Sequence, residues 1–438
     1  MPQEVVYHSR FGHGVVKKTR YNGFELYVEF ENGHCGWIRR DKLERVEESV
    51  PRRSAKSARP LFKDRQFNCR RMIEAFRLGI VPYDCIEDFT FGRDREAETL
   101  IRWLKGSDSN ALVLNGDYGV GKTHLLQWAY SYAFQNGFAV AIVGVEPADA
   151  PFHKPKQLYN RLVRSFSYHS KTHGRSGFRS FMKEVQDRGG LKDHRYFKYL
   201  FQYLGYLGGI GYDEILWEWI EGSESAIRPP VDILNFYNAL PGLYPYTTAV
   251  NIYCYLLSGI GWASRHVLGL RGTLLIFDEA ESVDNEYSAR QAEMGRNTLR
   301  ALVRLAQDRP ELAGRPDGAG LKCCLVGSSR GTPFSYRQPS SLKILFAFAP
   351  TKALDQIEDL KKVPKIDLKP LSKDALREVF YRIGEIYAEA YNLKKKSVSM
   401  GDAFDRLLAE RDGGTRFFVK GCVESLDLCR LTEGKGLS

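Results

Sequence analysis

The sequence predicts an α/β fold with a buried parallel sheet, and two segments carry this prediction. Residues 111–114 are a short apolar run of strand length, followed by a glycine-rich segment and then by a helical pattern over residues 124–134. Residues 273–277 are a second apolar run, which ends in the acidic pair Asp278-Glu279. Strands that alternate with helices in this way are typical of an α/β fold.

The glycine-rich segment matches the phosphate-binding pattern G-x-x-x-x-G-K-[ST] at every fixed position. Glycines let backbone N–H groups close around phosphate oxygens, and the helix N-terminus adds its positive end. We expect Lys122 to reach the β- and γ-phosphates of ATP and the Thr123 hydroxyl to ligate Mg²⁺. The predicted nucleotide-binding residues of this segment are Gly116, Asp117, Tyr118, Gly119, Val120, Gly121, Lys122, Thr123 and His124.

The acidic pair suits the same chemistry. Asp278 is expected to hold Mg²⁺ through its water shell. Glu279 is expected to orient or deprotonate an attacking water, which makes it a candidate catalytic residue. Because the two motifs need each other, their joint presence indicates an ATPase rather than a chance match.

Length and composition suit a globular protein of two or three domains. The chain has 438 residues, of which 43% are hydrophobic. No apolar run approaches the roughly 18 residues that a membrane span needs, and the N-terminus lacks a charged-then-apolar signal. We therefore expect a cytoplasmic protein without a membrane partner. The eight cysteines include no C-x-x-C spacing, which argues against a zinc site or a disulfide framework.

A basic balance points to a polyanionic partner, and nucleic acid is the first choice. The net charge is +11 and the pI is about 9.1. The linker over residues 49–67 is rich in arginine and lysine and is expected to grip DNA phosphates without sequence specificity. Its candidate contacts are Arg52, Arg53, Lys56 and Arg59. The alternatives are a merely soluble basic surface and a solvated spacer.

Residues 1–48 predict a small, strongly bent β-barrel. Residues 24–30 alternate like a half-buried strand, and Asn32-Gly33 is a favoured hairpin turn. The segment resembles the Tudor-like or SH3-like modules of CarD, transcription-repair coupling factor and the UvrD C-terminus. The resemblance implies contact with RNA polymerase or DNA-processing partners, and the alternative is a barrel that only packs on its neighbour. The matching residues are His8, Phe11, Gly12, Gly14, Val15, Val28, Phe30 and Gly33.

Residues 68–369 form the predicted ATPase core, with a helical insertion at about 168–271 that is rich in aromatic residues. These aromatics are more typical of a core than of base stacking. Phe91-Gly-Arg93 ahead of the loop resembles the entry signal of the AAA+ and STAND ATPases. The resemblance implies that residues 86–92 hold adenine and that Arg93 belongs to the nucleotide site.

The AAA+ resemblance also suggests sensor residues. Residues 322–327 are predicted as a further buried strand, with Ser328 or Ser329 as the first sensor of the γ-phosphate. Arg330 or Arg337 is a candidate arginine finger for a neighbouring subunit in a homo-oligomer, with an ordinary surface arginine as the alternative. In the predicted lid, residues 370–438, Arg416 is the candidate second sensor and catalytic charge, with helix-start solvation as the alternative.

The stretch over residues 70–431 resembles the P-loop ATP-binding proteins of the bacteriophage exclusion (BREX) systems, of the BrxC/BrxD kind and most like BrxD. The segments that carry the resemblance are residues 70–82, 91–93, 116–124, 146–154 and 414–416. The N-terminal barrel is a departure, because it is not associated with every member. The whole sequence thus predicts an AAA+-like P-loop NTPase core with a helical insertion and a C-terminal helical lid, preceded by a small β-barrel.

Three functions follow as hypotheses. The first is an ATPase of an anti-phage system that couples its nucleotide state to DNA or to other BREX proteins. The second is a scaffold that binds ATP, barely hydrolyses it, and recruits RNA polymerase or another partner through the barrel. The third is an origin- or helicase-loading AAA+ protein, and the lack of a winged-helix stretch after the predicted lid counts against it.

Overall fold

The computed structural model forms two compact units, Met1–Asp64 and Arg65–Ser438, and each is described by itself. No helix among the described residues is long and apolar enough to cross a bilayer. The structure describes residues 5–8, 12–20, 25–30, 35–39, 44–45, 65–82, 85–204, 210–223, 240–244, 250–309, 332, 334–393, 400–409 and 414–434.

The N-terminal unit is a small antiparallel sheet of five strands in the order β4-β3-β2-β1-β5. Val6, Leu26 and Val28 are its buried core. The pairing of β2 with β3 shifts register between Val16 and Lys18, which bends the strands. The predicted small β-unit is confirmed, while its likeness to Tudor-type modules stays a prediction. The strands are β1 Val5–His8, β2 Gly12–Arg20, β3 Glu25–Phe30, β4 Cys35–Arg39 and β5 Glu44–Arg45.

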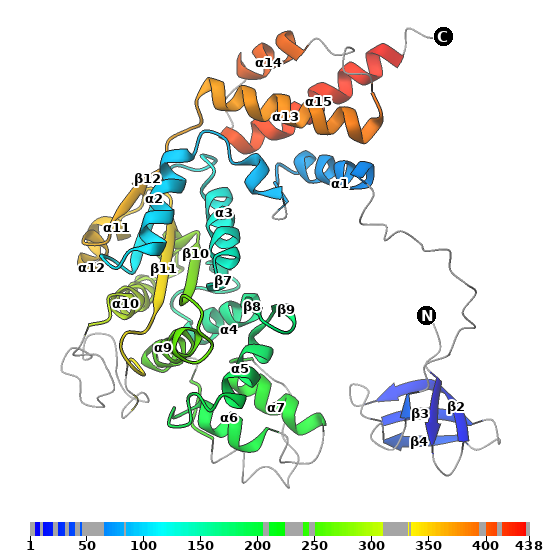
Figure 1. Cartoon of the computed structure of the whole chain (residues 1–438), viewed down its shortest axis with the longest axis vertical. Coiled ribbons are helices and arrows are strands. Elements are labelled where there is room, and N and C mark those ends of the chain that lie inside the picture. Colours follow the sequence, from blue (N-terminus) through cyan, green and yellow to red (C-terminus); the bar gives the residue numbers. More distant parts are fainter. Residues whose placement is uncertain are drawn as a thin grey trace. The chain divides into compact units, whose positions relative to one another are not determined.

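The main unit is built on a parallel sheet of five strands in the order β12-β6-β11-β10-β7. This arrangement confirms the predicted α/β class. The strand that ends in Asp278, β10, is separated from β6 by β11, and β10 and β11 lie side by side in Figure 1. Because the three strands are parallel, the carboxyl ends of β6 and β10 lie at the same edge of the sheet. The strands are β6 Ala111–Asn115, β7 Ala139–Gly144, β10 Thr273–Asp278, β11 Leu342–Phe348 and β12 Lys365–Asp367.

The strand between β6 and β10 is β11, which was not predicted from the sequence. All 7 residues of β11 are buried, and it pairs in parallel with both neighbours. The strand expected over residues 322–327 lies outside the described part of the chain and stays a prediction.

Two helical layers cover the sheet, because successive side chains of each strand point to opposite faces. Leu112 and Leu114 share an apolar cluster with α2 and α3, whereas Ala111 and Val113 share one with α4, α9 and α10. The helices are α2 Asp94–Lys105, α3 Lys122–Gln135, α4 Pro155–Ser165, α9 Val250–His266 and α10 Ala289–Ala306.

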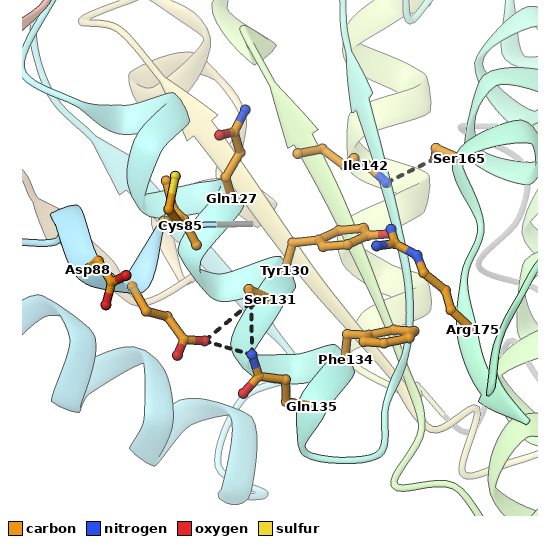
Figure 2. Close-up of a pocket in the computed structure, with 12 residues that line it drawn as sticks. Cys85, Asp88, Gln127, Tyr130, Ser131, Phe134, Gln135, Ile142, Ser165 and Arg175 are labelled. Carbon is orange, nitrogen blue, oxygen red and sulfur yellow. Dashed lines mark hydrogen bonds between the residues drawn. The ribbon is translucent and has the colours of Figure 1, made fainter. Parts of the chain in front are cut away.

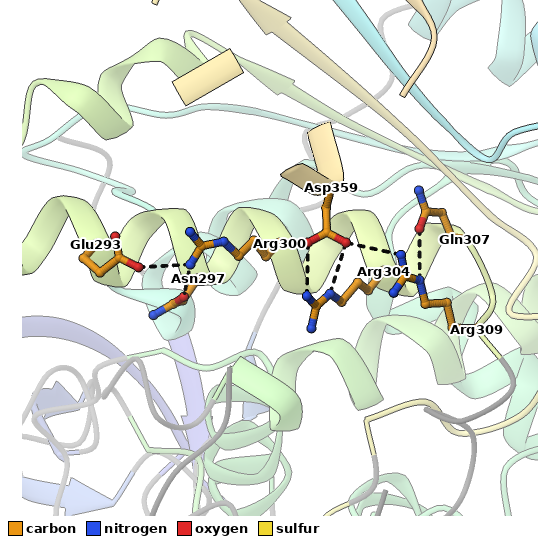
Figure 3. A network of polar contacts seen from close by, with 7 residues as sticks. All are labelled: Glu293, Asn297, Arg300, Arg304, Gln307, Arg309 and Asp359. Carbon is orange, nitrogen blue, oxygen red and sulfur yellow. Dashed lines mark hydrogen bonds and ion pairs between the residues drawn. The ribbon is translucent and has the colours of Figure 1, made fainter. Parts of the chain in front are cut away.

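A polar network fixes the short helix α12, Glu358–Lys361, against α10 (Figure 3). Asp359 is 7% exposed and accepts two hydrogen bonds from Arg304, at 3.2 Å from Nε and 3.1 Å from Nη2. Arg309 adds a third at 3.3 Å. Because the carboxylate faces two guanidinium groups in a mostly buried position, these contacts hold α12 against α10.

The predicted insertion contains a two-stranded hairpin and several helices, and described aromatic residues such as Tyr196, Phe197 and Trp217 belong to the core. His194 is fully buried and stacks on Tyr255 at 4.2 Å and against Phe197 at 4.3 Å between ring centroids. Burial lowers the pKa of His194 to about 3, so this ring is neutral. The elements are β8 Tyr168–Ser170, β9 Gly174–Ser176, α5 Phe178–Asp187, α6 Phe197–Tyr203 and α7 Ile210–Ile220.

The predicted lid is a cluster of helices, and the structure adds α1 to it. Ile73 and Phe76 of α1 share an apolar cluster with α13, α14 and α15. Arg77 donates a hydrogen bond to Asp427 Oδ1 at 3.1 Å, although the two residues are 350 positions apart in the sequence. Helix α1, most of which the sequence analysis placed in the predicted core over residues 68–369, therefore packs with the helices that follow that core. These helices are α1 Arg65–Arg77, α13 Lys373–Tyr391, α14 Met400–Ala409 and α15 Gly414–Gly434.

Candidate nucleotide site

The predicted phosphate-binding loop connects β6 to α3 at the carboxyl edge of the sheet. Gly119 and Gly121 have positive φ angles of 78° and 100°, which other residues rarely adopt. At Gly116, an added Cβ would lie 2.8 Å from the carbonyl oxygen of Leu368. The glycines of the motif are therefore needed for the loop to turn and to fit against its neighbours.

Lys122 lies inside this loop and is 8% exposed. Its Nζ donates to the carbonyl oxygens of Gly116 at 2.7 Å and of Asp117 at 3.1 Å. Burial lowers its pKa, and nearby carboxylates, Glu281 first and then Asp278, act in the opposite direction. The ammonium group is thus held at the place where the motif predicts phosphate.

The two predicted metal ligands meet. Thr123 Oγ1 donates to Asp278 Oδ2 at 2.7 Å, which joins the start of α3 to the end of β10. A hydroxyl and a carboxylate are hard oxygen ligands of the kind that Mg²⁺ accepts, with the remaining positions left to water and phosphate. No group of three His, Cys, Asp or Glu side chains suited to a metal occurs among the described residues. The residues thus fit a magnesium ion that is shared with a nucleotide, and not an all-protein cage.

Glu279 follows in a left-handed backbone conformation, with φ 56°. Its N–H donates to Asp278 Oδ1 at 2.9 Å, so the backbone of the pair is fixed. Burial raises the pKa of Glu279, and the charges of Asp278, Glu146 and Glu281 raise it further. A strained residue with a perturbed carboxylate next to a metal-binding pair is a typical catalytic position.

Arg93 and His124 support the phosphate-binding loop through hydrogen bonds. Arg93 is 5% exposed, and its Nη2 donates to the carbonyl oxygen of Val120 at 2.6 Å. His124 Nε2 lies 3.0 Å from Thr90 Oγ1, which donates to the carbonyl oxygen of Ile86 at 2.7 Å. Burial lowers the pKa of His124 to about 4, with Arg93 adding to the effect.

The lid touches the loop directly. The N–H of Thr415, at the start of α15, donates to the carbonyl oxygen of Gly119 at 3.0 Å. Arg416 is exposed and packs against Gly79, since a Cβ added at Gly79 would lie 2.6 Å from Arg416 Cγ. The structure thus places Arg416 beside the loop contact. Its role as second sensor stays a prediction.

The Gly414→Ala variant tests this contact. Gly414 has φ 71°, and an added Cβ would lie 3.1 Å from the carbonyl oxygen of Gly119. We expect ATP affinity to fall about tenfold because the loop is displaced, and stability to fall about 1–2 kcal/mol through backbone strain. Gly269→Ala is the matched control, since its φ is 73° and nothing lies within 4 Å of its Cβ position. The contact has no role if both variants bind ATP equally well in titrations.

Of the remaining predicted sensor, arginine-finger and DNA-contact residues, the structure describes only Arg337. Ser328, Ser329 and Arg330 lie outside the described residues, as do Arg52, Arg53, Lys56 and Arg59. Arg337 instead forms an ion pair with Asp193 at 2.7 Å and lies 4.7 Å from the ring centroid of Trp262. A guanidinium engaged in this way counts against a free arginine finger.

Sequence reasoning missed two groups near the site. The polar residue that follows β11 is Thr351, whose hydroxyl bonds Asp284. Glu281 is 6% exposed and faces Lys122 and Tyr118. The apolar run over residues 342–348 could have indicated a strand that is followed by the polar residue Thr351. No sequence pattern marked Glu281.

A cavity of about 720 Å³ among the described residues does not coincide with the loop. It lies along the later turns of α3, between residues 85–88 and Arg175 (Figure 2). Arg175 donates to the Tyr130 hydroxyl at 3.0 Å and covers the Phe134 ring. None of residues 116–123 lines this cavity, so the chemistry of the candidate site must be sought at the loop.

Comparison with known proteins agrees with this geometry. Residues 65–190 match the family of BREX system ATP-binding proteins BrxC/D. The match runs from α1 through the loop to α5. No curated protein matches the chain. The parallel sheet of five strands confirms the predicted α/β fold, and the loop meets the acidic pair at its edge.

Solved structures resemble the chain loosely. A DNA replication initiation factor and the replication initiator DnaA bound to AMPPCP and single-stranded DNA are each 12% identical, with TM-scores of 0.34 and 0.31. Each alignment covers 78% of this chain and 64% of the other, so the chain spans less than two thirds of those proteins. The E. coli MS115-1 HORMA:CdnC:Trip13 complex is 11% identical, with a TM-score of 0.24, over 82% and 86% of the two chains.

Proposed function

We propose that this protein binds ATP with Mg²⁺, hydrolyses it, and serves a bacterial BREX defence system against phage. The observation that carries the proposal is the hydrogen bond of 2.7 Å between Thr123 and Asp278, with Glu279 next in the chain. It brings the phosphate-binding loop, a magnesium ligand pair and a candidate base to one edge of the sheet. The family match over residues 65–190 supports the assignment to BREX.

Each residue then has a distinct task. Lys122 exchanges its carbonyl partners for the β- and γ-phosphate oxygens, and the loop N–H groups bind the same phosphates. Thr123 and Asp278 hold Mg²⁺, which offsets phosphate charge when it is bound. Glu279 positions a water for in-line attack on the γ-phosphate and accepts its proton. In this scheme Arg416 adds positive charge from the lid.

The nucleotide state is proposed to reach partners through the lid. Thr415 bonds the loop, so a change at the phosphates moves α15 and the helices packed on it. The partners we propose are DNA, gripped through the basic linker, other BREX proteins, further copies of this chain and RNA polymerase at the N-terminal sheet. The net charge of +11 supports the DNA partner.

The proposal is tested by titrating the full chain with a fluorescent ATP analogue and by measuring phosphate release. We expect Mg²⁺ to tighten ATP binding by about tenfold or more in the wild type, because the ion bridges protein and phosphate. Thr123→Val keeps the side-chain shape but removes the hydroxyl, so it should abolish this Mg²⁺ effect. Thr99→Val, which changes a half-buried threonine of α2, is the control.

Two results would oppose the proposal in different ways. A wild-type chain that binds no ATP with or without Mg²⁺ would refute it. A chain that binds ATP but releases no phosphate, alone or with DNA, would instead support the scaffold hypothesis.

A further inference from the structure

An unusual carboxylate lies beside the loop lysine. Glu281 is in the short helix η7, Ala280–Asp284, directly after the acidic pair. It is 6% exposed, and its Oε2 has no hydrogen-bond partner among the described residues. A buried carboxylate with one oxygen unbonded is costly, so a positive charge nearby is needed to compensate it.

Lys122 supplies that charge. Burial lowers the pKa of Lys122, and among the carboxylates that oppose this effect Glu281 acts more strongly than Asp278, Asp117 or Glu279. No ion pair within 4.0 Å joins Glu281 to a cation in the described part of the chain, so the two charges act across a gap.

Tyr118 closes this arrangement from the solvent side. Its side chain is 73% exposed although it belongs to the loop, and Lys122 Nζ lies 5.1 Å from its ring centroid. Its hydroxyl interacts with the Glu281 carboxylate. The ring therefore spans from the lysine to the carboxylate, on the side that faces solvent.

From these contacts we infer that Glu281 and Tyr118 are positioning residues that hold Lys122 back in the loop and so weaken ATP binding. Lys122 must leave its two carbonyl partners and the field of Glu281 to reach the β- and γ-phosphates. The bound phosphates then bring further negative charge toward the carboxylate, and like charges repel. Glu281 and Tyr118 thus raise the ATP concentration that is needed to fill the site. This inference rests on the proposed ATP site.

The test is the ATP affinity of Glu281→Gln, titrated with a fluorescent analogue in the presence of EDTA so that magnesium plays no part. We expect the amide, which keeps the shape and removes the charge, to bind ATP about five- to tenfold more tightly. Tyr118→Phe, which loses only the hydroxyl, should tighten binding less. AMP lacks the phosphates that Lys122 contacts. It should therefore displace the fluorescent analogue equally well from the wild type and from Glu281→Gln.

Glu286→Gln is the matched control. Glu286 is also buried, with 1% of its side chain exposed, but it pairs with His153 at 2.9 Å instead of facing Lys122. Its replacement should leave ATP affinity unchanged. If the wild type binds ATP and Glu281→Gln binds it equally or more weakly, the inference is wrong while the proposed function stands. If the wild type binds no ATP, the proposed function itself fails.

Discussion

Glu279→Gln is expected to lower the rate of ATP hydrolysis by about 10²–10⁴-fold, which is the usual contribution of a general base. The amide keeps the size of the side chain and cannot accept the proton of the attacking water. ATP affinity should stay within about twofold, since Thr123, Asp278 and the loop hold the phosphates and the ion. The backbone N–H that bonds Asp278 is unchanged by the substitution.

Phosphate release under saturating ATP measures the first effect, and titration with the fluorescent analogue measures the second. Glu98→Gln, at an exposed position of α2, is the control for the same chemical change. Unchanged turnover in Glu279→Gln would assign water activation to another group. A joint loss of binding and turnover would show that Glu279 supports the loop instead of the chemical step.

Contiguous motifs were predictable because their chemistry is written in neighbouring residues. The loop needs glycines at positive φ followed by Lys122 and Thr123, and a strand before it leaves few other folds possible. The acidic pair is recognised in the same way, as polar residues at the end of an apolar strand. Its meeting with Thr123 at 2.7 Å follows once both strands join one parallel sheet.

Long-range choices were not predictable in this way. The apolar run at 342–348 was not recognised as a strand from the sequence, and only its parallel pairing with β6 and β10 makes it the strand between them. The place of α1 depends on partners such as Asp427, 350 positions away. Glu281 has no motif at all, because its importance comes from burial beside Lys122.

Lys122→Ala is expected to weaken ATP binding about 100-fold, because charge-assisted hydrogen bonds to phosphate contribute about 3 kcal/mol. It should also lower the free energy of unfolding by about 1–3 kcal/mol, since it leaves the buried carboxylate of Glu281 without a nearby cation. The second effect is separable from the first. In the double variant Lys122→Ala/Glu281→Gln the stability should return toward the wild-type value, while ATP affinity stays low.

Urea denaturation and ATP titration of the four proteins form a double-mutant cycle that isolates the coupling between the two side chains. A positive coupling in stability and a tighter ATP complex in Glu281→Gln alone would have one cause, the attraction of Glu281 for the loop lysine. If the double variant is as unstable as Lys122→Ala, the two charges are independent, and the low exposure of Glu281 must be compensated by another group. Wild-type ATP affinity in Lys122→Ala would contradict the assignment of residues 116–123 as the nucleotide site, because no other residue of the loop carries a positive charge.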